Sequence, residues 1–248
     1  MAVRAAVADA AAAAVVLTSG GLDSTTLLAL AAARGRRIHA LSFRYGQRHA
    51  VELDAAARQA RRFGAVAHEI VDLAHLGRLL AHATSLVAGS TLEVPKHAGD
   101  DTTIPSTYVP ARNTLFLAYG LAWAEALDAG EVWIGVNALD YSGYPDCRPA
   151  FIEAFARTAA LATRRGVEGS PIAIVTPLQH LRKHEIVALG LAHGVDYGDT
   201  VSCYDPRTDD SGTALACGAC DSCRLRREGF ALAGVADPTR YATAAPHP

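Results

Sequence analysis

Two groups of residues in this sequence have types and spacings that could do chemistry, and the first is a turn of small residues. The apolar run 13–17 leads into the stretch 18–25, which reads Thr-Ser-Gly-Gly-Leu-Asp-Ser-Thr. Such a turn between a strand and a helix points several backbone N–H groups toward one place, and the helix N-terminus adds the positive end of its dipole. Phosphate binding is therefore predicted, with Asp23 and Ser24 suited to the helix N-cap. On composition alone, an ordinary capped turn explains the same residues. The predicted phosphate contacts are Thr18, Ser19, Gly20, Gly21, Leu22, Asp23, Ser24 and Thr25.

The second group is a set of four cysteines, Cys203, Cys217, Cys220 and Cys223. Four thiolates complete the closed tetrahedral coordination of a structural Zn²⁺ and leave no position for water or substrate, so a scaffold role is predicted. The alternative is a redox Cys-x-x-Cys pair. Such pairs normally follow a strand at the start of a helix, whereas three of these cysteines share a turn of Gly, Asp and Ser residues. Cys147 stands apart, and its surroundings fit a small buried residue and a pocket wall equally well.

Composition narrows the classes of protein that this sequence can encode. Half of the 248 residues are apolar and 19% are charged, which is typical of a folded chain large enough to need no disulfides. The net charge of -2 provides no basic surface for a nucleic-acid backbone, and no apolar run is long enough to cross a membrane. The alanine-rich residues 1–14 lack the layout of a signal peptide. A cytoplasmic protein is expected, in which clustered cysteines bind metal rather than form disulfides.

Short β-rich apolar runs alternate with longer helical patterns. This alternation predicts βαβ units and an α/β fold, with a five-stranded parallel sheet covered by helices on both faces. The stretch 87–107 contains Gly and Pro residues without a sustained period, which indicates either a long mobile loop beside the site or an insertion without function. The predicted strands are Ala13–Thr18, Ile38–Phe43, Val66–Val71, Glu131–Val136 and Ile172–Val175. The predicted helices are Asp23–Arg34, Gln47–Phe63, Asn113–Asp128, Pro149–Arg164 and Leu181–His193.

The pattern Ser-Gly-Gly-x-Asp-Ser at 19–24 resembles the pyrophosphate loop of the ATP pyrophosphatase (PP-loop) superfamily, and the Gly-Lys-Ser/Thr of P-loop NTPases does not occur in the sequence. With the other matched blocks, the sequence is similar over nearly its whole length to the QueC family of 7-cyano-7-deazaguanine synthases. Those blocks are Tyr45–His49 with Glu52, Tyr108–Asn113, Gly135–Pro149, Pro177 with Lys183–Ile186, and Gly194–Tyr197 with Ser202–Tyr204.

The resemblance implies a Rossmann-like fold of the adenine nucleotide α-hydrolase type. Residues 1–200 would form the PP-loop domain, and residues 201–248 a zinc-binding segment packed on it. Two features look unusual for the family, namely the long spacing between Cys203 and Cys217 and the alanine-rich N-terminus. Because a longer loop adds little closure entropy, the metal site is expected to tolerate that spacing.

The resemblance also implies an activity. The family converts 7-carboxy-7-deazaguanine and ammonia to the nitrile 7-cyano-7-deazaguanine (preQ0), in queuosine or deazapurine biosynthesis, as an ATP-dependent C–N ligase. Adenylation supplies a leaving group, ammonia displaces AMP to give an amide, and a second adenylation leads to the nitrile. Lys183, and after it Arg112, are the candidates for the cation that stabilises charge on the phosphates, and Asp23 is the candidate for holding Mg²⁺. A solvated surface charge is the alternative for both cations. A homodimer is implied as well.

A guanine-like ring needs acceptors for its N1–H and its amine, together with apolar or aromatic faces. The segment 140–146 follows a strand end, where open α/β sheets bind ligands. Asp140 or Asp146 is predicted to bind the guanine edge, and Tyr141 or Tyr144 to stack on the ring; a turn capped by Asp is the alternative. His49 and Glu52 could handle ammonia or its proton, although a place on a helix surface explains them equally.

Three other functions share parts of this pattern. A tRNA-modifying adenylating enzyme would use the same loop, but it would need a basic RNA-binding surface or a further domain, neither of which the sequence contains. A zinc-knuckle interaction module would leave the phosphate turn without a purpose. A relative that transfers the activated deazaguanine to another acceptor, such as a protein amine, would have the same sequence features. The expected partners are therefore small molecules only, without nucleic acid or membrane.

Overall fold

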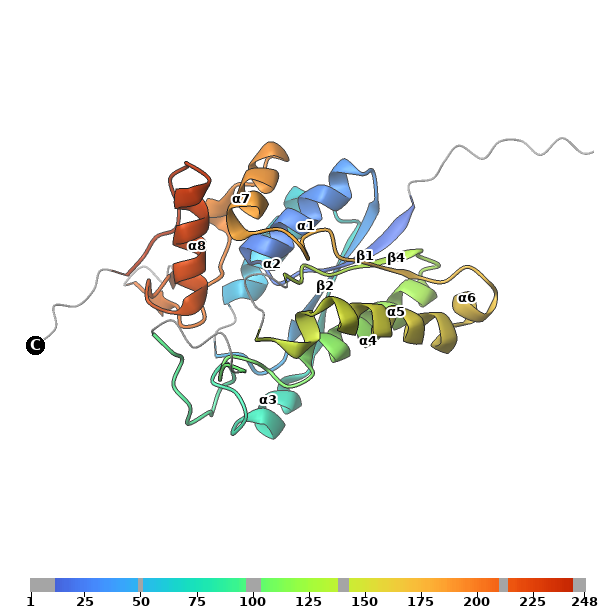
Figure 1. The fold of residues 1–248 in the computed structure, drawn as a ribbon, viewed down its shortest axis with the longest axis horizontal. Helices are drawn as coiled ribbons and strands as arrows, with labels where there is room; N and C mark the ends of the chain where they lie inside the picture. Colours follow the sequence, from blue (N-terminus) through green and yellow to red (C-terminus); the bar gives the residue numbers. More distant parts are fainter. Residues whose placement is uncertain (1–11, 49–50, 97–103, 138–142, 210–213, 243–248) are drawn as a thin grey trace, which may run out of the picture.

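The centre of the molecule is a five-stranded sheet in the order β3-β2-β1-β4-β5, in which every neighbouring pair is parallel. The computed structural model describes residues 12–48, 51–96, 104–137, 143–209 and 214–242. The chain starts in the middle of the sheet, adds β2 and β3 on one side, and then crosses β1 to add β4 and β5 on the other (Figure 1). The strand order therefore reverses between β1 and β4, and a crevice opens at such a point at the carboxyl ends of the strands.

The five predicted strands are all present, with small differences at their ends. Their bounds are β1 (Ala13–Leu17), β2 (Arg37–Arg44), β3 (Ala67–Asp72), β4 (Glu131–Trp133) and β5 (Ala173–Val175). Every residue of β1 is buried, as expected for a central strand covered on both faces. The predicted strand through Val136 was too long, because the chain leaves the sheet after Trp133 and residues 134–136 turn toward a cavity.

Helices cover both faces of the sheet, which confirms the predicted layers (Figure 1). The helices α1 (Leu22–Ala33), α2 (Val51–Arg62) and α7 (Lys183–Ala192) lie on one face. The other face carries α4 (Arg112–Ala126) and α5 (Pro149–Ala162), the latter followed by the short α6 (Arg164–Val167). Two 3₁₀ turns, η1 (Pro145–Cys147) and η2 (Tyr197–Asp199), lie in the connections.

Several elements were not predicted. These are α3 (Ala74–Leu80), the C-terminal helix α8 (Asp221–Leu232), and a small antiparallel pair formed by β6 (Arg207–Thr208) and β7 (Ala214–Leu215). The helix predicted from Gln47 is described only from Val51 onward, and Gln47 instead forms an isolated bridge with Val87. The helix predicted through Arg164 ends at Ala162, because Thr163 is extended and its side chain caps α6.

The residues around 87–107 were predicted as a loop. Their described parts contain neither a helix nor a strand, yet Val87 and Val94 are buried in the core and Ser85 N–H donates to the carbonyl of Ser106. Both ends of this segment are thus packed against the domain. Residues 97–103 lie outside the described part of the chain.

Two hydrophobic cores lie on the two faces of the sheet. The buried Cys220 and Cys223 belong to the same core as Val15 of β1 and Leu117 of α4. The other core joins β1, α1 and α7 to Phe230 of α8. Within the described ranges, no helix is both long enough and apolar enough to span a lipid bilayer.

Candidate functional site: a cavity at the carboxyl edge of the sheet

A cavity of about 260 Å³ lies at the carboxyl ends of β1, β2 and β4. Thr18 follows β1, Tyr45 follows β2 and Gly135 follows β4, and all three line this cavity. The cavity therefore occupies the point at which the strand order reverses, where ligands bind in open α/β sheets. Its volume approaches the range of about 300–1,000 Å³ that is usual for small-molecule sites.

The turn after β1 runs through a position at which any side chain is strained, so glycine is strongly favoured there. Gly20 has a φ of +80°, in the left-handed region, and a Cβ built on it would lie 2.4 Å from the carbonyl oxygen of Glu52 and 2.6 Å from the backbone nitrogen of Ala56. Both contacts are with the backbone of α2, which cannot move aside easily. The sequence places glycine here because the turn must pass closely over the start of α2.

Hydroxyl groups organise the backbone of this turn. Ser24 Oγ accepts a hydrogen bond from the N–H of Ser19 at 3.1 Å and donates to the carbonyl of Gly21. The prediction that Asp23 and Ser24 form the N-cap was wrong by two or three positions: Gly21 is the N-cap, and α1 begins at Leu22. Helical geometry extends further back than the sequence indicated, because Ser24 Oγ closes the turn from inside the first turn of the helix.

The other predicted phosphate contacts differ in their access to the cavity. Thr18, Ser19, Gly21, Leu22, Asp23 and Ser24 line it. Gly20 packs against the backbone of α2, and Thr25 is fully buried. The N–H groups of Leu22, Asp23 and Ser24 precede the first intrahelical hydrogen bond, which runs from Thr25 to Gly21, so helical geometry leaves them available to an anion or another acceptor.

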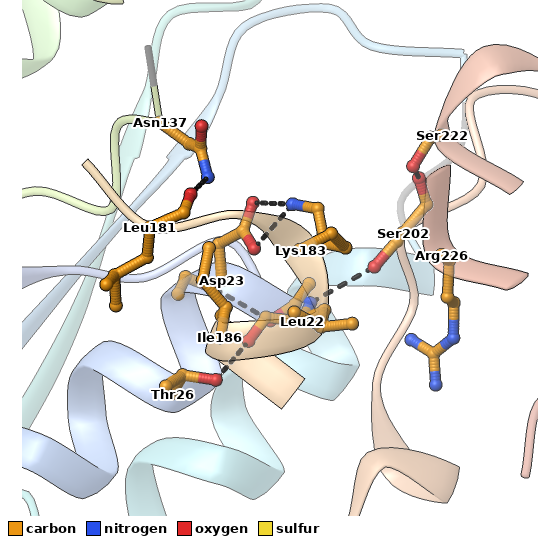
Figure 2. Close-up of polar contacts among 12 residues, drawn as sticks. Leu22, Asp23, Thr26, Asn137, Leu181, Lys183, Ile186, Ser202, Ser222 and Arg226 are labelled. Carbon is orange, nitrogen blue, oxygen red and sulfur yellow. Dashed lines mark hydrogen bonds and ion pairs between the residues drawn. The ribbon is translucent and has the colours of Figure 1, made fainter. Parts of the chain in front are cut away.

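Lys183 and Asp23 form an ion pair at the edge of this turn (Figure 2). The ammonium of Lys183 lies 2.8 and 2.9 Å from the two carboxylate oxygens of Asp23, and the Lys side chain is only 8% exposed. Gly229 of α8 makes room for the Lys stem, since a Cβ there would lie 2.5 Å from Lys183 Cγ. The structure thus brings two predicted catalytic residues together from positions 160 residues apart.

A polar wall stands on the β2 side of the cavity. Gln47 donates to the carboxylate of Glu52 at 2.9 Å and accepts from the N–H of Tyr45. Burial raises the pKa of Glu52 to about 7, against the opposing effects of the hydrogen bond from Gln47 and the charge of Arg112. Burial by itself lowers the pKa of the Arg112 guanidinium. Electrostatic interactions with Tyr45 and Asp146 outweigh this effect, so the pKa is raised overall. This wall therefore combines a fixed cation with a carboxyl group that titrates near neutral pH.

The predicted substrate-binding residues differ in where they lie relative to the cavity. Tyr144 lines the cavity, and its hydroxyl is hydrogen-bonded to Thr107 at 2.7 Å. Asp146 is buried, and its carboxylate accepts the backbone N–H of Asn113 at 2.9 Å, at the start of α4. Its carboxylate therefore orients α4 beside the cavity. Asp140 and Tyr141, like His49, lie outside the described residues.

Cys147 is buried and forms part of the cavity lining, so both predicted descriptions of it hold at once. Burial raises the pKa of its thiol to about 12. Its sulfur accepts a hydrogen bond from Asn113 at 3.3 Å. The thiol is therefore protonated at neutral pH and is not an activated nucleophile.

The four cysteines at 203, 217, 220 and 223 form one cluster, in which the sulfur atoms all lie within 4.8 Å of one another. Cys203 Sγ accepts the N–H of Cys217 at 3.2 Å, and Cys217 Sγ accepts the N–H of Cys220 at 3.4 Å. Gly218, with a φ of +75°, lets the chain turn between these ligands. Backbone donors to sulfur favour the thiolate form that binds metal, so the donor set fits a metal ion with four sulfur ligands.

Several residues of the site were not identified from the sequence. Ser202, Ser222 and Arg226 line the cavity from the C-terminal segment, and Asn137 donates to the carbonyl of Leu181 at 2.6 Å (Figure 2). Ser202 and Asn137 lie within matched sequence blocks, which was the available signal for these two. Nothing in the local sequence distinguishes Ser222 and Arg226 from ordinary polar residues.

The fold defines the chain as an α/β protein with a glycine turn after its first strand and a cluster of four cysteines that could hold a metal ion. The family model described as queuosine biosynthesis protein QueC matches residues 13–234, and the chain belongs to this family. Proteins named 7-cyano-7-deazaguanine synthase are similar to it. The one from Magnetococcus marinus is 57% identical over 92% of this chain and 96% of its own length, and that from Pseudomonas putida is 55% identical over 92% and 97%.

Among solved structures, NMN synthetase from Francisella tularensis has a TM-score of 0.47 and 16% identity, covering 92% of this chain and 79% of that one.

Proposed function

We propose that this chain is a 7-cyano-7-deazaguanine synthase, which uses ATP to convert a carboxylate and ammonia into a nitrile. The observation that supports this most strongly is the high identity to proteins of that name over nearly the full length of both chains, together with the turn at Gly20 at the carboxyl edge of the sheet. We also propose that the 7-cyano-7-deazaguanine formed is used in queuosine or deazapurine biosynthesis.

ATP binds with its β- and γ-phosphates against the turn that connects β1 to α1. The N–H groups at the start of α1 and the positive end of the helix dipole favour the phosphate charge. Asp23 and Ser24, which precede the first intrahelical hydrogen bond, supply N–H groups of this kind, and Gly21, with no side chain, leaves the approach open. This position directs the α-phosphorus toward the rest of the cavity.

The first chemical step makes a leaving group. A carboxylate oxygen of the substrate attacks the α-phosphorus of ATP, and the bond to the bridging oxygen breaks, so pyrophosphate leaves with the electron pair. Negative charge on the departing group is stabilised by Lys183, which is positioned by its ion pair with Asp23. Ammonia then attacks the carbonyl carbon of the acyl adenylate, and AMP leaves as the amide forms.

The second round repeats this chemistry on the amide. The amide oxygen attacks the α-phosphorus of a second ATP, and pyrophosphate again leaves. The oxygen then departs with AMP, and the two N–H protons are lost, which leaves the nitrile. One turn can serve both rounds, since both attacking oxygens are bonded to the same carbon.

Glu52 is the proposed acceptor of the protons from nitrogen. Its carboxylate lines the cavity, its backbone carbonyl packs under Gly20, and its pKa of about 7 leaves a useful fraction ionised at neutral pH. Gln47 orients this carboxylate, and Arg112, which lines the same cavity, is the proposed contact for an anionic part of the substrate. These roles make the polar wall the region where ammonia reacts.

Tyr144 is the proposed aromatic face for the deazaguanine ring. Its ring lines the cavity and is held by the hydrogen bond from its hydroxyl to Thr107 and by packing against Tyr108, whose ring centroid lies 5.9 Å away. The guanine edge is assigned to Asp140. Asp146 acts indirectly, by orienting the start of α4.

Two metal ions complete the proposal. The four clustered cysteines would hold one structural Zn²⁺, for which four sulfur ligands are the usual set. Asp23, whose carboxylate is 21% exposed at the cavity, would hold Mg²⁺ directly or through water. When bound, Mg²⁺ neutralises phosphate charge.

The experiment is incubation of the purified protein with 7-carboxy-7-deazaguanine, ATP, Mg²⁺ and ammonia, followed by mass detection of the products. The amide and then the nitrile are expected, with two AMP formed for each nitrile. Formation of ADP in place of AMP would contradict the adenylation scheme. A deazaguanine adduct on a protein amine or on added tRNA, without free nitrile, would assign the activated acid to a different acceptor.

A further inference from the structure

The segment 200–203 packs directly on the phosphate turn and forms hydrogen bonds with it. The N–H of Val201 donates to the carbonyl of Gly20 at 2.9 Å. The N–H of Leu22 donates to the hydroxyl of Ser202 at 3.1 Å (Figure 2). Leu22 and Ser202 are 180 residues apart in the sequence. The first N–H group of α1 is therefore bound to the Ser202 hydroxyl, so the positive end of the helix dipole acts on that hydroxyl.

Ser202 is among the residues that line the cavity, and its hydroxyl lies against the start of α1. Its oxygen accepts the Leu22 N–H, and among the described residues no hydrogen bond donated by this hydroxyl is found. An oxygen that accepts from a helix N-terminus is polarised, which strengthens the hydrogen bond that its own hydrogen can donate. The hydroxyl is thus suited to an anionic acceptor in the cavity.

The C-terminal segment fixes the position of Ser202. The hydroxyl of Ser222, at the start of α8, donates to the Ser202 carbonyl (Figure 2). The neighbouring residues Cys203 and Cys223 belong to the cysteine cluster. Arg226, only 3% exposed, donates to Thr200 Oγ1. The C-terminal residues thus hold the segment 200–203 on one side, and its other side contacts the phosphate turn.

We propose that Ser202 is a nucleotide-binding residue, whose hydroxyl donates to a phosphate oxygen of ATP while its oxygen accepts the Leu22 N–H. This inference depends on the proposed use of ATP. It gives the cysteine cluster a second purpose beyond folding, because the cluster holds the Ser202 backbone where the hydroxyl reaches the phosphate. The C-terminal segment is then part of the phosphate site.

The test compares Ser202→Ala, Ser202→Thr and the native protein in binding ATP and inorganic pyrophosphate by titration calorimetry. Ser202→Ala should weaken the binding of both ligands by about tenfold or more, since a hydrogen bond to a charged group contributes about 1.5–3 kcal/mol. Ser202→Thr keeps the hydroxyl and should restore most of the affinity. Ser170→Ala, at an exposed serine outside the cavity, is the matched control and should bind as the native protein does.

Metal content is measured for each variant, and binding is compared at equal content after dialysis against Zn²⁺. If Ser202→Ala regains native affinity once its metal is restored, the defect lies in the cluster and the proposal is wrong. Affinities within twofold of native for both ligands, or a loss for ATP without a loss for pyrophosphate, would also overturn it. If the native protein itself binds neither ligand, the proposed function fails instead, so the two failures are distinguishable.

Discussion

Replacing Gly20 by alanine should both destabilise the protein and displace the phosphate turn. The residue has a φ of +80°, and an added Cβ would lie 2.4 Å from the carbonyl oxygen of Glu52. The left-handed conformation costs an alanine about 1–2 kcal/mol. Forcing a methyl group into a closed contact costs about 1–3 kcal/mol more. The total loss of unfolding free energy should be about 2–5 kcal/mol.

Gly35→Ala separates these two contributions. Gly35 has a φ of +65°, but no atom lies within 4 Å of the position that its Cβ would take. This variant should therefore lose only the conformational part, about 1–2 kcal/mol. The difference between the two variants, about 2 kcal/mol, corresponds to about 6 °C in Tm for a chain of this size.

Gly21→Ala tests the cavity side of the same turn. Its Cβ would meet Ser19 Oγ and the Val201 carbonyl at 3.4 Å, close contacts that a small adjustment can relieve, and its φ is not in the left-handed region. Stability should therefore change little, whereas the methyl group should hinder phosphate approach and weaken ATP binding. The assays are urea unfolding and ATP titration on all three variants. Equal stability of Gly20→Ala and Gly35→Ala would refute the packing argument for this turn.

Three further predictions concern the rest of the site. Lys183→Ala should lower the free energy of unfolding by about 1–3 kcal/mol, because the partly buried Asp23 loses its partner, and should slow pyrophosphate release by about a hundredfold. The control is Lys96→Ala, which removes an exposed ion pair and should change stability and pyrophosphate release little. The folded-state pKa of Glu52 is raised from 4.5 to about 7, so its contribution to stability is lost as the pH rises from about 4.5 to about 7. Urea unfolding should therefore show that Glu52→Gln is more favourable, relative to the native protein, at pH 8 than at pH 5. The same difference in stability at both pH values would exclude the raised pKa of Glu52. Chelation of the metal should make four thiols react quickly with a thiol reagent while the buried Cys147 stays slow, and a fifth fast thiol would contradict its burial.

The parts of the site that the sequence predicted are those in which chemistry is local. The turn at 19–24 is encoded by adjacent small residues that follow one strand, and three of the four clustered cysteines lie within a stretch of seven residues. The parallel sheet was predictable because its strands are short apolar runs separated by helices. Each of these features depends on neighbours in the chain.

The features that were missed depend on contacts between distant segments. Helix α8 buries Arg226, whose charge is compensated by Asp237 at 3.1 Å, so the helix did not show the apolar face that a sequence pattern requires. The carboxylate of Asp146 binds the backbone of Asn113, a partner that no sequence rule would select. Ser202 reaches Leu22 only in the folded chain. Tertiary hydrogen bonds of this kind carry no local signature.

The most direct test of the account is exchange of radiolabelled pyrophosphate into ATP, measured with and without 7-carboxy-7-deazaguanine and in the absence of ammonia. Adenylation at the phosphate turn predicts rapid exchange that requires the acid, because the acyl adenylate forms reversibly when no amine is present to consume it. A metal-loaded protein that binds both substrates and still shows no acid-dependent exchange would contradict the central claim.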